Sequence, residues 1–217
     1  MKYAAIFDMD GVIVDNMSYH ARAWEEFFNR YNPPMEFEEF MQHFGRTNRD
    51  LFGVLFDREL SEDEVVRYGE EKEALYREVY APHVKPVPGL IDFLKALKEQ
   101  GVLTAVATSA PRVNLDFVFD HLPIQPFFDA AVDSSDVTIG KPNPEIFLKA
   151  AAKLDCTASQ CVVFEDSFAG IQAGKNAGMK VVGVATSHAT EKLKDTDLGI
   201  SDFLEITVIK ILGLLET

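Results

Sequence analysis

Short apolar runs alternate with helix-like segments over most of this chain, and that alternation constrains its fold more than any other feature. The runs have strand composition and cover residues 3–7, 102–107, 128–132, 161–164 and 180–185, with a further short strand expected near 198–200. Segments with helical periodicity lie beside them, at 90–100, 111–121, 144–154, 168–177 and 204–215. Such alternation predicts an α/β fold, in which a parallel sheet is covered by helices on both faces.

One long segment, residues 17–81, interrupts the alternation, because it shows several helical patterns and almost no strand pattern. Its last helix is expected to begin at Ser61, where Ser61 and Glu64 have the spacing of a capping box. We therefore predict an all-helical insertion over residues 16–83, within a core domain built from residues 1–15 and 84–217. The alternative is that these helices simply cover one face of the sheet.

Composition and charge narrow the class of protein. The chain has 217 residues, of which 47% are apolar, and a formal net charge of −14 without a strongly basic stretch, which argues against nucleic acid as a partner. The N-terminal residues do not resemble a secretory signal, and no apolar run approaches the roughly 18 residues that span a bilayer. We expect a cytoplasmic protein with no membrane contact, whose two cysteines, Cys156 and Cys161, are reduced and chemically idle.

The first apolar run ends at two aspartates, Asp8 and Asp10, followed by Gly11. Carboxylates at the end of a buried strand are costly unless something offsets their desolvation, and a Mg²⁺ ion is a common compensation. One such carboxylate can attack a phosphoryl group, and a second can donate and then accept the proton that the reaction requires. The alternative for this short motif alone is a pair of turn or helix-cap carboxylates.

Three further polar motifs also come where predicted strands end. Thr108 and Ser109 can donate hydrogen bonds to a phosphoryl oxygen, although either can instead cap the following helix. Lys141 lies in a proline-rich loop before a helix, where it can neutralise charge between a carboxylate and a phosphoryl group. Glu165 and Asp166 follow the fourth apolar run and can complete a Mg²⁺ site.

These four motifs, in this order, resemble those of the haloacid dehalogenase superfamily of phosphotransferases, in its β-phosphoglucomutase-like phosphatase branch. The matching residues are Phe-Asp-Met-Asp-Gly-Val at residues 7–12, Thr108, Lys141 within Gly-Lys-Pro-Asn-Pro-Glu, and the pair Glu165-Asp166. The resemblance implies a Rossmann-like core, a small helical cap domain inserted after the first strand, dependence on Mg²⁺ and an aspartyl-phosphate intermediate.

The resemblance also implies roles for individual residues. Asp8 resembles the nucleophile and Asp10 the general acid and base, with Thr108 and Lys141 completing the catalytic set. The metal ligands that it implies are Asp8, Asp10 through its backbone carbonyl, Glu165 and Asp166. The substrate-binding residues that we expect are His20, Arg46, Arg49, Lys72 and Ser109.

The cap segment departs from the mutase pattern at two positions. Asn48 occupies the position of a mutase arginine, and Asn16 replaces a threonine of the mutase hinge. Both changes argue against the second phosphate-binding site that a mutase needs. We therefore expect a monomeric, Mg²⁺-dependent phosphatase acting on a small phosphorylated metabolite, in particular a sugar phosphate, with a β-phosphoglucomutase as the alternative.

Two other classes fit the sequence less well. A dehalogenase of 2-haloacids needs no acid at the leaving halide, so Asp10 would have no purpose there. A phosphoaspartate receiver domain has a similar acidic cluster, but residues 17–81 have no counterpart in such a domain.

Overall fold

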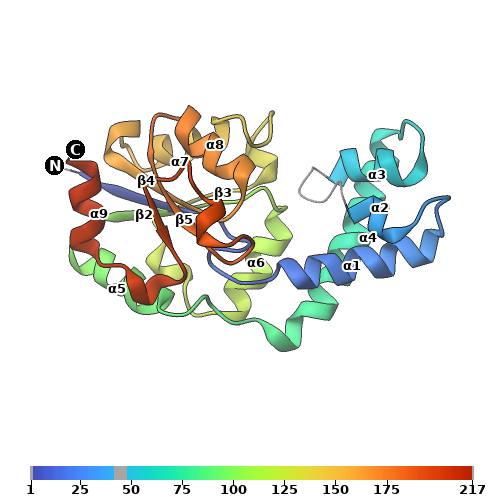
Figure 1. Cartoon of the computed structure of the whole chain (residues 1–217), viewed down its shortest axis with the longest axis horizontal. Coiled ribbons are helices and arrows are strands. Elements are labelled where there is room, and N and C mark those ends of the chain that lie inside the picture. Colours follow the sequence, from blue (N-terminus) through green and yellow to red (C-terminus); the bar gives the residue numbers. More distant parts are fainter. Residues whose placement is uncertain (1, 42–47, 217) are drawn as a thin grey trace. The chain divides into compact units, whose positions relative to one another are not determined.

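A computed structural model of the protein describes residues 2–41 and 48–216. The chain forms two compact units, drawn in Figure 1. One unit joins the residues up to Asp15 to those from Val84 onward, and the other comprises Asn16–His83.

The first unit contains a six-stranded parallel sheet in the order β3-β2-β1-β4-β5-β6. The strands are β1 (Ala4–Phe7), β2 (Leu103–Ala107), β3 (Ala130–Val132), β4 (Cys161–Glu165), β5 (Lys180–Val184) and β6 (Leu198–Ile200). Strand β1 is central and pairs with both β2 and β4. The order reverses beside β1, and an open sheet binds its ligands at the carboxyl ends of the strands where such a reversal occurs. The predicted α/β fold with a parallel sheet is confirmed.

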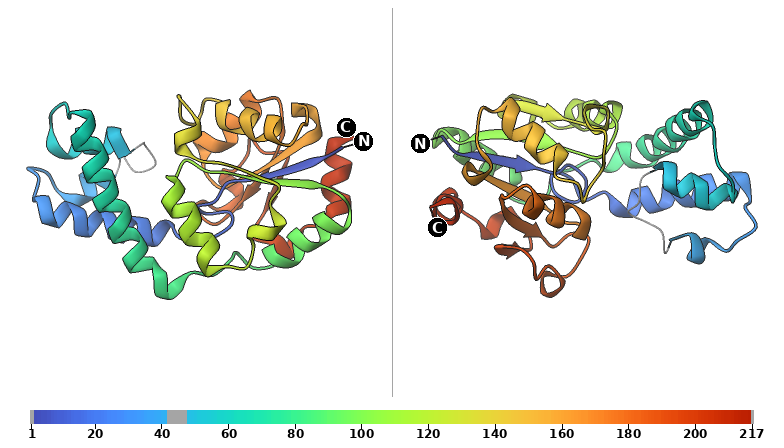
Figure 2. Two further views of the ribbon diagram at one scale, coloured as in Figure 1. Left: turned by 180° about the vertical axis from the view of Figure 1, so that it is seen from behind. Right: turned by 90° about the horizontal axis from the view of Figure 1, so that it is seen from above.

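Helices cover both faces of this sheet (Figure 2). Helices α5 (Leu90–Glu99) and α9 (Val208–Leu215) contact each other and strands β2 and β4. Helices α7 (Glu145–Lys153) and α8 (Phe168–Asn176) also contact each other, and they pack on the strands from β3 to β5. The remaining helix of this unit, α6 (Arg112–His121), connects β2 to β3.

Two elements begin more than one residue later than the sequence pattern predicts. The third strand was expected from residue 128, but the 3₁₀ turn Gln125–Phe127 precedes it, and the amide of Phe128 is bonded back to the carbonyl of Gln125. The last helix was expected from residue 204, but a separate 3₁₀ turn over Phe203–Glu205 comes first. Helix α9 then begins after Thr207, whose side chain caps it.

Phe7 organises the packing of the sheet on the α5 side. Its ring is fully buried and stacks on Phe164 of β4, with the ring centroids 4.6 Å apart. The rings of Phe93, Phe128 and Phe203 surround the same position, with centroids 6.0–6.4 Å from that of Phe7. Because Phe7 directly precedes Asp8, this packing fixes the end of β1 and the direction of the residue that follows it.

In the second unit, the residues that the structure describes, 16–41 and 48–83, form helices joined by short turns and loops and contain no strand. Its helices are α1 (Met17–Tyr31), α2 (Phe37–Met41), α3 (Asn48–Phe56) and α4 (Glu62–Tyr80). The predicted capping box of Ser61 and Glu64 is present at the start of α4. The buried core of this unit is aromatic, with Trp24 packed against Phe27, Phe40 and Phe52. In neither unit does a described helix combine the length and the apolar character that a membrane span requires.

We expect Phe7→Ala to destabilise the first unit by about 3–5 kcal/mol, since it opens a cavity among the four rings that pack on Phe7. Urea unfolding followed by circular dichroism measures the change. Leu204→Ala, at a side chain that is 74% exposed, is the control and is expected to change the free energy of unfolding little. Equal effects of the two substitutions would contradict this account of the core.

Candidate active site

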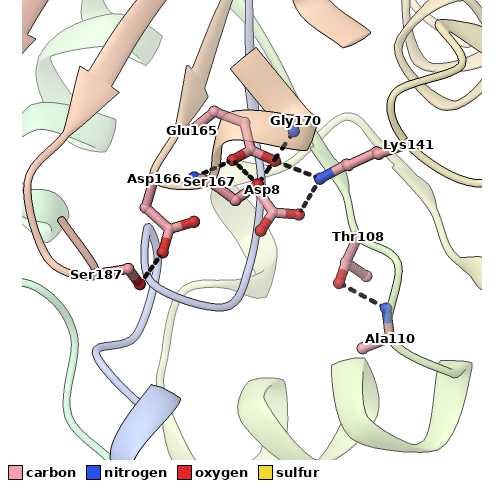
Figure 3. A network of polar contacts seen from close by, with 9 residues as sticks. All are labelled: Asp8, Thr108, Ala110, Lys141, Glu165, Asp166, Ser167, Gly170 and Ser187. Atoms are coloured by element: carbon pink, nitrogen blue, oxygen red, sulfur yellow. Dashed lines mark hydrogen bonds and ion pairs between the residues drawn. The ribbon is translucent and has the colours of Figure 1, made fainter. Parts of the chain in front are cut away.

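Three acidic side chains come together where the central strands β1 and β4 end. The two strands are paired in register, Phe7 opposite Phe164, and the amide of Asp8 continues the ladder by donating to the Phe164 carbonyl at 3.0 Å. This register places Asp8 beside Glu165 and Asp166, as Figure 3 shows. Each of the three offers a carboxylate oxygen within 4.8 Å of the others.

Lys141 lies in the loop before α7 and reaches into this acidic group (Figure 3). Its Nζ is 2.7 Å from Asp8 Oδ1 and 2.5 Å from Glu165 Oε1. The lysine side chain is only 8% exposed, so both ion pairs are shielded from solvent. One ammonium thus faces three buried carboxylates, and the cluster carries excess negative charge when all of them are ionised.

Burial and the neighbouring charges together shift the pKa values of this cluster. Burial raises the pKa of Asp8 to about 7, with Lys141 opposing the rise and Glu165 and Asp10 adding to it. Burial, reinforced by the negative charges of Glu165 and Asp8, raises the pKa of Asp166 to about 8. Burial by itself would lower the pKa of Lys141, but its attraction to Asp8 and Glu165 outweighs this and raises the pKa. The lysine therefore stays charged, but its single positive charge does not neutralise the three carboxylates.

The donor set of this cluster suits a hard divalent cation. Mg²⁺ prefers carboxylate and carbonyl oxygens and a small number of protein ligands. An added positive charge would favour the ionised forms of Asp8 and Asp166, whose pKa values are raised mainly by burial. Glu165 is placed differently, because both of its oxygens already accept hydrogen bonds. Its Oε1 accepts from Lys141, and its Oε2 accepts from the backbone and side chain of Ser167 at 2.8 and 2.9 Å.

Two glycines allow these carboxylates to approach the backbone closely. Gly11 has a positive φ of 78°, and a Cβ atom built there would lie 2.0 Å from Asp166 Oδ2. A Cβ atom at Gly170, in the first turn of α8, would lie 1.7 Å from Glu165 Oε1. Any side chain at either position would displace an acidic residue of the site.

Asp10 lies in the tight loop that follows β1. It is half-buried, and its negative charge contributes to the raised pKa of Asp8, which makes it an electrostatic neighbour of that carboxyl group. Its side chain does not belong to the group of three ligand oxygens described above. The sequence interpretation assigned its backbone carbonyl, not its carboxylate, to the metal.

Thr108 directly follows β2 and is fully buried, whereas its neighbour Ser109 is exposed. The Thr108 hydroxyl accepts a hydrogen bond from the amide of Ala110 at 3.0 Å (Figure 3), which leaves its own hydrogen available for donation. The alternative that Thr108 or Ser109 caps the next helix is wrong, because α6 has Pro111 at its N-cap position and no side-chain cap.

Two of the expected substrate-binding residues, His20 and Lys72, lie together in the helical unit. Lys72 Nζ is 2.9 Å from His20 Nδ1 and 2.9 Å from Glu73 Oε1, and all three side chains are buried. Asn48 donates to the same Glu73 oxygen at 2.9 Å. Burial would raise the pKa of Glu73, but Lys72 and then His20 outweigh it and lower the pKa to about 2.

The other two expected residues of this unit have different outcomes. Arg49 is exposed, and its guanidinium pairs with the carboxylate of Glu62 at the start of α4. Arg46 lies outside the described residues.

Sequence reasoning missed the contacts that Glu73, Thr186 and Ser187 make. Glu73 carries no motif signal beside Lys72. The Thr186 hydroxyl donates to the carbonyl of Gly11, and the Ser187 hydroxyl donates to the Asp166 carboxylate. Thr186 and Ser187 lie just after β5, the strand beside β4, and this position is the signal that could have drawn attention to them.

Residues 4–178 match the family model of haloacid dehalogenase-like hydrolases. This chain belongs to that family. It is therefore an enzyme of the hydrolase class, as the motif resemblance predicts, and the Rossmann-like core expected from that resemblance is confirmed.

Named relatives and a solved structure agree with this assignment. The chain is 31% identical to the fructose-1-phosphate phosphatase YqaB of Escherichia coli (strain K12) over 84% of this chain and 97% of that protein. It is 33% identical to the β-phosphoglucomutase of Bacillus subtilis (strain 168) over 83% of this chain and 82% of that protein. A crystal structure of a family IA, variant 3 hydrolase from Entamoeba histolytica superposes with a TM-score of 0.92, 32% identity and full coverage of both chains.

The buried ion pair of Lys72 and Glu73 gives a prediction about stability. We expect Glu73→Gln to destabilise the helical unit by about 3–5 kcal/mol at pH 7, because the substitution leaves Lys72 buried without its carboxylate partner. Unfolding followed by the fluorescence of Trp24 measures this, since Lys72 Nζ lies 5.3 Å from the ring centroid of that residue, the only tryptophan in the chain.

The same pair predicts a pH dependence. The pKa of Glu73 is lowered from 4.5 to about 2, so its contribution to stability is complete above pH 4.5 and is lost as the pH falls towards 2. The difference between wild type and Glu73→Gln should shrink over that interval. Glu62→Gln, at an exposed partner of Arg49, is the control, and a similar loss in both variants would contradict the prediction.

Proposed function

We propose that this enzyme is a Mg²⁺-dependent phosphatase that hydrolyses a small phosphorylated metabolite, of the sugar phosphate class, through an aspartyl-phosphate intermediate. The observation that carries the proposal is the position of Asp8 at the end of β1, between Lys141 on one side and Asp166 on the other. Two relatives named for sugar phosphate chemistry, the fructose-1-phosphate phosphatase and the β-phosphoglucomutase, support the substrate class.

In the first step, a carboxylate oxygen of Asp8 attacks the phosphorus atom of the substrate. The bond between phosphorus and the sugar oxygen breaks, and Asp10 gives its proton to that leaving oxygen. The products are a free sugar hydroxyl and a phosphoryl group attached to Asp8.

In the second step, the ionised Asp10 takes a proton from a water molecule, whose oxygen attacks the same phosphorus atom. The bond between Asp8 and phosphorus breaks, which restores the Asp8 carboxylate and releases inorganic phosphate. The proton taken from water returns Asp10 to the state in which the cycle began, so protons balance over the two steps.

Charge on the transferring phosphoryl group is stabilised by residues that the fold holds in advance. The Lys141 ammonium is already within 2.7 Å of Asp8, and the buried Thr108 hydroxyl can donate its hydrogen to a phosphoryl oxygen. We assign Glu165 to positioning, because it binds Lys141 and the amide of Ser167 at the same time.

Asp8, Asp166 and the backbone carbonyl of Asp10 are the groups that we propose hold Mg²⁺. When bound, the ion would supply positive charge that reduces repulsion between the attacking carboxylate and the phosphoryl group. The residues fit this task because one lysine faces three buried carboxylates, which leaves negative charge for a cation to offset.

We propose that the helical unit is the cap domain that the resemblance implies, and that it selects the substrate. His20, Arg49 and Lys72 are its candidate contacts, Ser109 is the candidate in the core, and Arg46 remains a candidate from the sequence alone. We further propose that the enzyme acts in the cytoplasm as a monomer, with its phosphorylated substrate as the partner.

The alternative is a β-phosphoglucomutase, which the 33% identity to the Bacillus subtilis enzyme favours. A mutase must hold a second phosphate group while the phosphoryl group moves to another hydroxyl of the sugar. Here Asn48 stands where the mutase arginine is expected, and its side chain is bonded to Glu73. This arrangement supports hydrolysis over phosphoryl transfer between sugar hydroxyls.

We expect Asp8→Asn to lower kcat for a sugar phosphate by ~10³-fold or more, since the amide is not a nucleophile for phosphorus. Release of inorganic phosphate in the presence of Mg²⁺ measures the rate. Asp92→Asn, at an exposed carboxylate in α5, is the matched control and should retain the wild-type rate. Near wild-type hydrolysis by Asp8→Asn would exclude Asp8 as the nucleophile.

The product distinguishes the two candidate functions. With β-glucose 1-phosphate, Mg²⁺ and a trace of the glucose bisphosphate, the phosphatase releases inorganic phosphate and glucose, whereas a mutase forms glucose 6-phosphate. We expect inorganic phosphate to appear from fructose 1-phosphate or β-glucose 1-phosphate, without accumulation of glucose 6-phosphate. Rapid formation of glucose 6-phosphate would instead identify a mutase.

A further inference from the structure

The loop after β5 contacts the active-site cluster through two consecutive hydroxyl groups. The Ser187 Oγ donates to Asp166 Oδ2, which Figure 3 shows, and the Thr186 Oγ1 donates to the carbonyl oxygen of Gly11. Neither residue belongs to the four motifs that define the site. The two bonds connect this loop to the segment after β1 and to the segment after β4 at the same time.

The Asp166 carboxylate is enclosed by these neighbours. On one side lies Gly11, where even a Cβ atom would come within 2.0 Å of Asp166 Oδ2. Gly11 is itself fixed, since its amide donates to the Val14 carbonyl at 2.7 Å and its carbonyl accepts from Thr186. Ser187 supplies the hydrogen bond to the same Oδ2 atom, so its hydroxyl and Gly11 together restrict how the carboxylate can turn.

The loop has a further anchor beyond Ser187. The His188 ring stacks on Phe168, the first residue of α8, with centroids 4.3 Å apart and planes 19° from parallel. Helix α8 begins directly after Ser167, which is adjacent to Asp166 in the chain. Both neighbours of Ser187 in the chain are therefore anchored. Thr186 is hydrogen-bonded to Gly11, and His188 is stacked on Phe168.

Control of carboxylate orientation matters for a metal ligand. An ionised carboxylate only accepts hydrogen bonds, and it turns about its Cβ–Cγ bond unless a donor fixes one oxygen. A donor on one oxygen favours the ionised form and directs the group, so that less ordering is needed when a cation binds. Partners of this kind typically change metal affinity by about 10–100-fold when they are removed.

We propose that Ser187 is a positioning residue for the Mg²⁺ ligand Asp166, and that Thr186 supports it by holding the Gly11 loop. The proposal rests on the proposed function, because it assumes that Asp166 binds Mg²⁺. It extends the site to a fifth segment of the chain, which follows β5.

Isothermal titration of the substrate-free protein with Mg²⁺ tests this proposal without reference to activity. We expect Ser187→Ala to raise the Kd for Mg²⁺ by about tenfold and Ser187→Thr, which keeps a hydroxyl, to restore it to within about threefold of wild type. Ser201→Ala is the matched control. It removes a hydroxyl from the loop after the neighbouring strand β6, where the backbone amide and not the side chain bonds to Glu205, and it should leave the Kd unchanged.

Thermal unfolding separates positioning from a general loss of stability. For Ser187→Ala we expect a smaller rise of Tm on adding Mg²⁺ than in wild type, whereas a purely structural role would lower Tm equally with and without the ion. In kinetic measurements, Ser187→Ala should need a higher Mg²⁺ concentration than wild type for its half-maximal rate. Its kcat at saturating Mg²⁺ should differ less from the wild-type value than its rate at low Mg²⁺ does.

The outcomes distinguish failure of this proposal from failure of the proposed function. If the wild-type protein binds Mg²⁺ and Ser187→Ala binds it with the same Kd, the role of Ser187 is overturned and the proposed function is left intact. A raised Kd in Ser187→Thr equal to that of Ser187→Ala would also overturn it, because the hydroxyl would then not be responsible. No Mg²⁺ binding by the wild-type protein would contradict the proposed function and this inference together.

Discussion

The ion pair between Lys141 and Asp8, 2.7 Å apart in a shielded position, is the interaction on which the rest of the site depends. It joins a loop before α7 to the end of the central strand β1, across a separation of 133 residues in the chain. The lysine also binds Glu165, which in turn holds the amide of Ser167 at the start of α8. One buried ammonium thus orients Asp8 and, through Glu165, connects the neighbouring strand end to the first turn of a helix.

The same cluster is electrostatically incomplete, and that incompleteness connects structure to function. Burial raises the pKa values of Asp8 and Asp166 to about 7 and about 8, and the negative charge that three carboxylates and one lysine leave there adds to the rise. A protein that only needed stability would be better served by apolar residues there. The proposed function accounts for this arrangement, because a divalent cation and the lysine would both offset charge on a phosphoryl group during transfer.

Much of the fold could be predicted from the sequence, because apolar runs and strand-end carboxylates are local signals. The sequence predicts four site residues whose side chains the structure brings together at one edge of the sheet, namely Asp8, Lys141, Glu165 and Asp166. The details that depend on three-dimensional neighbours were not predictable. The bond from Ser187 to Asp166 depends on which strand lies beside β4, and strand order is not written in any local pattern.

Chemical trapping of the phosphorylated enzyme tests the central claim most directly. The protein is mixed briefly with a sugar phosphate and Mg²⁺ and is then quenched in acid. Reduction with borohydride converts a phosphorylated aspartate to homoserine. Mass spectrometry then identifies the residue at position 8 in the peptide that contains it. The account predicts homoserine at position 8 in a substrate-dependent amount, with Asp10 and Asp166 unchanged. Turnover of the same substrate without modification of residue 8 would contradict it.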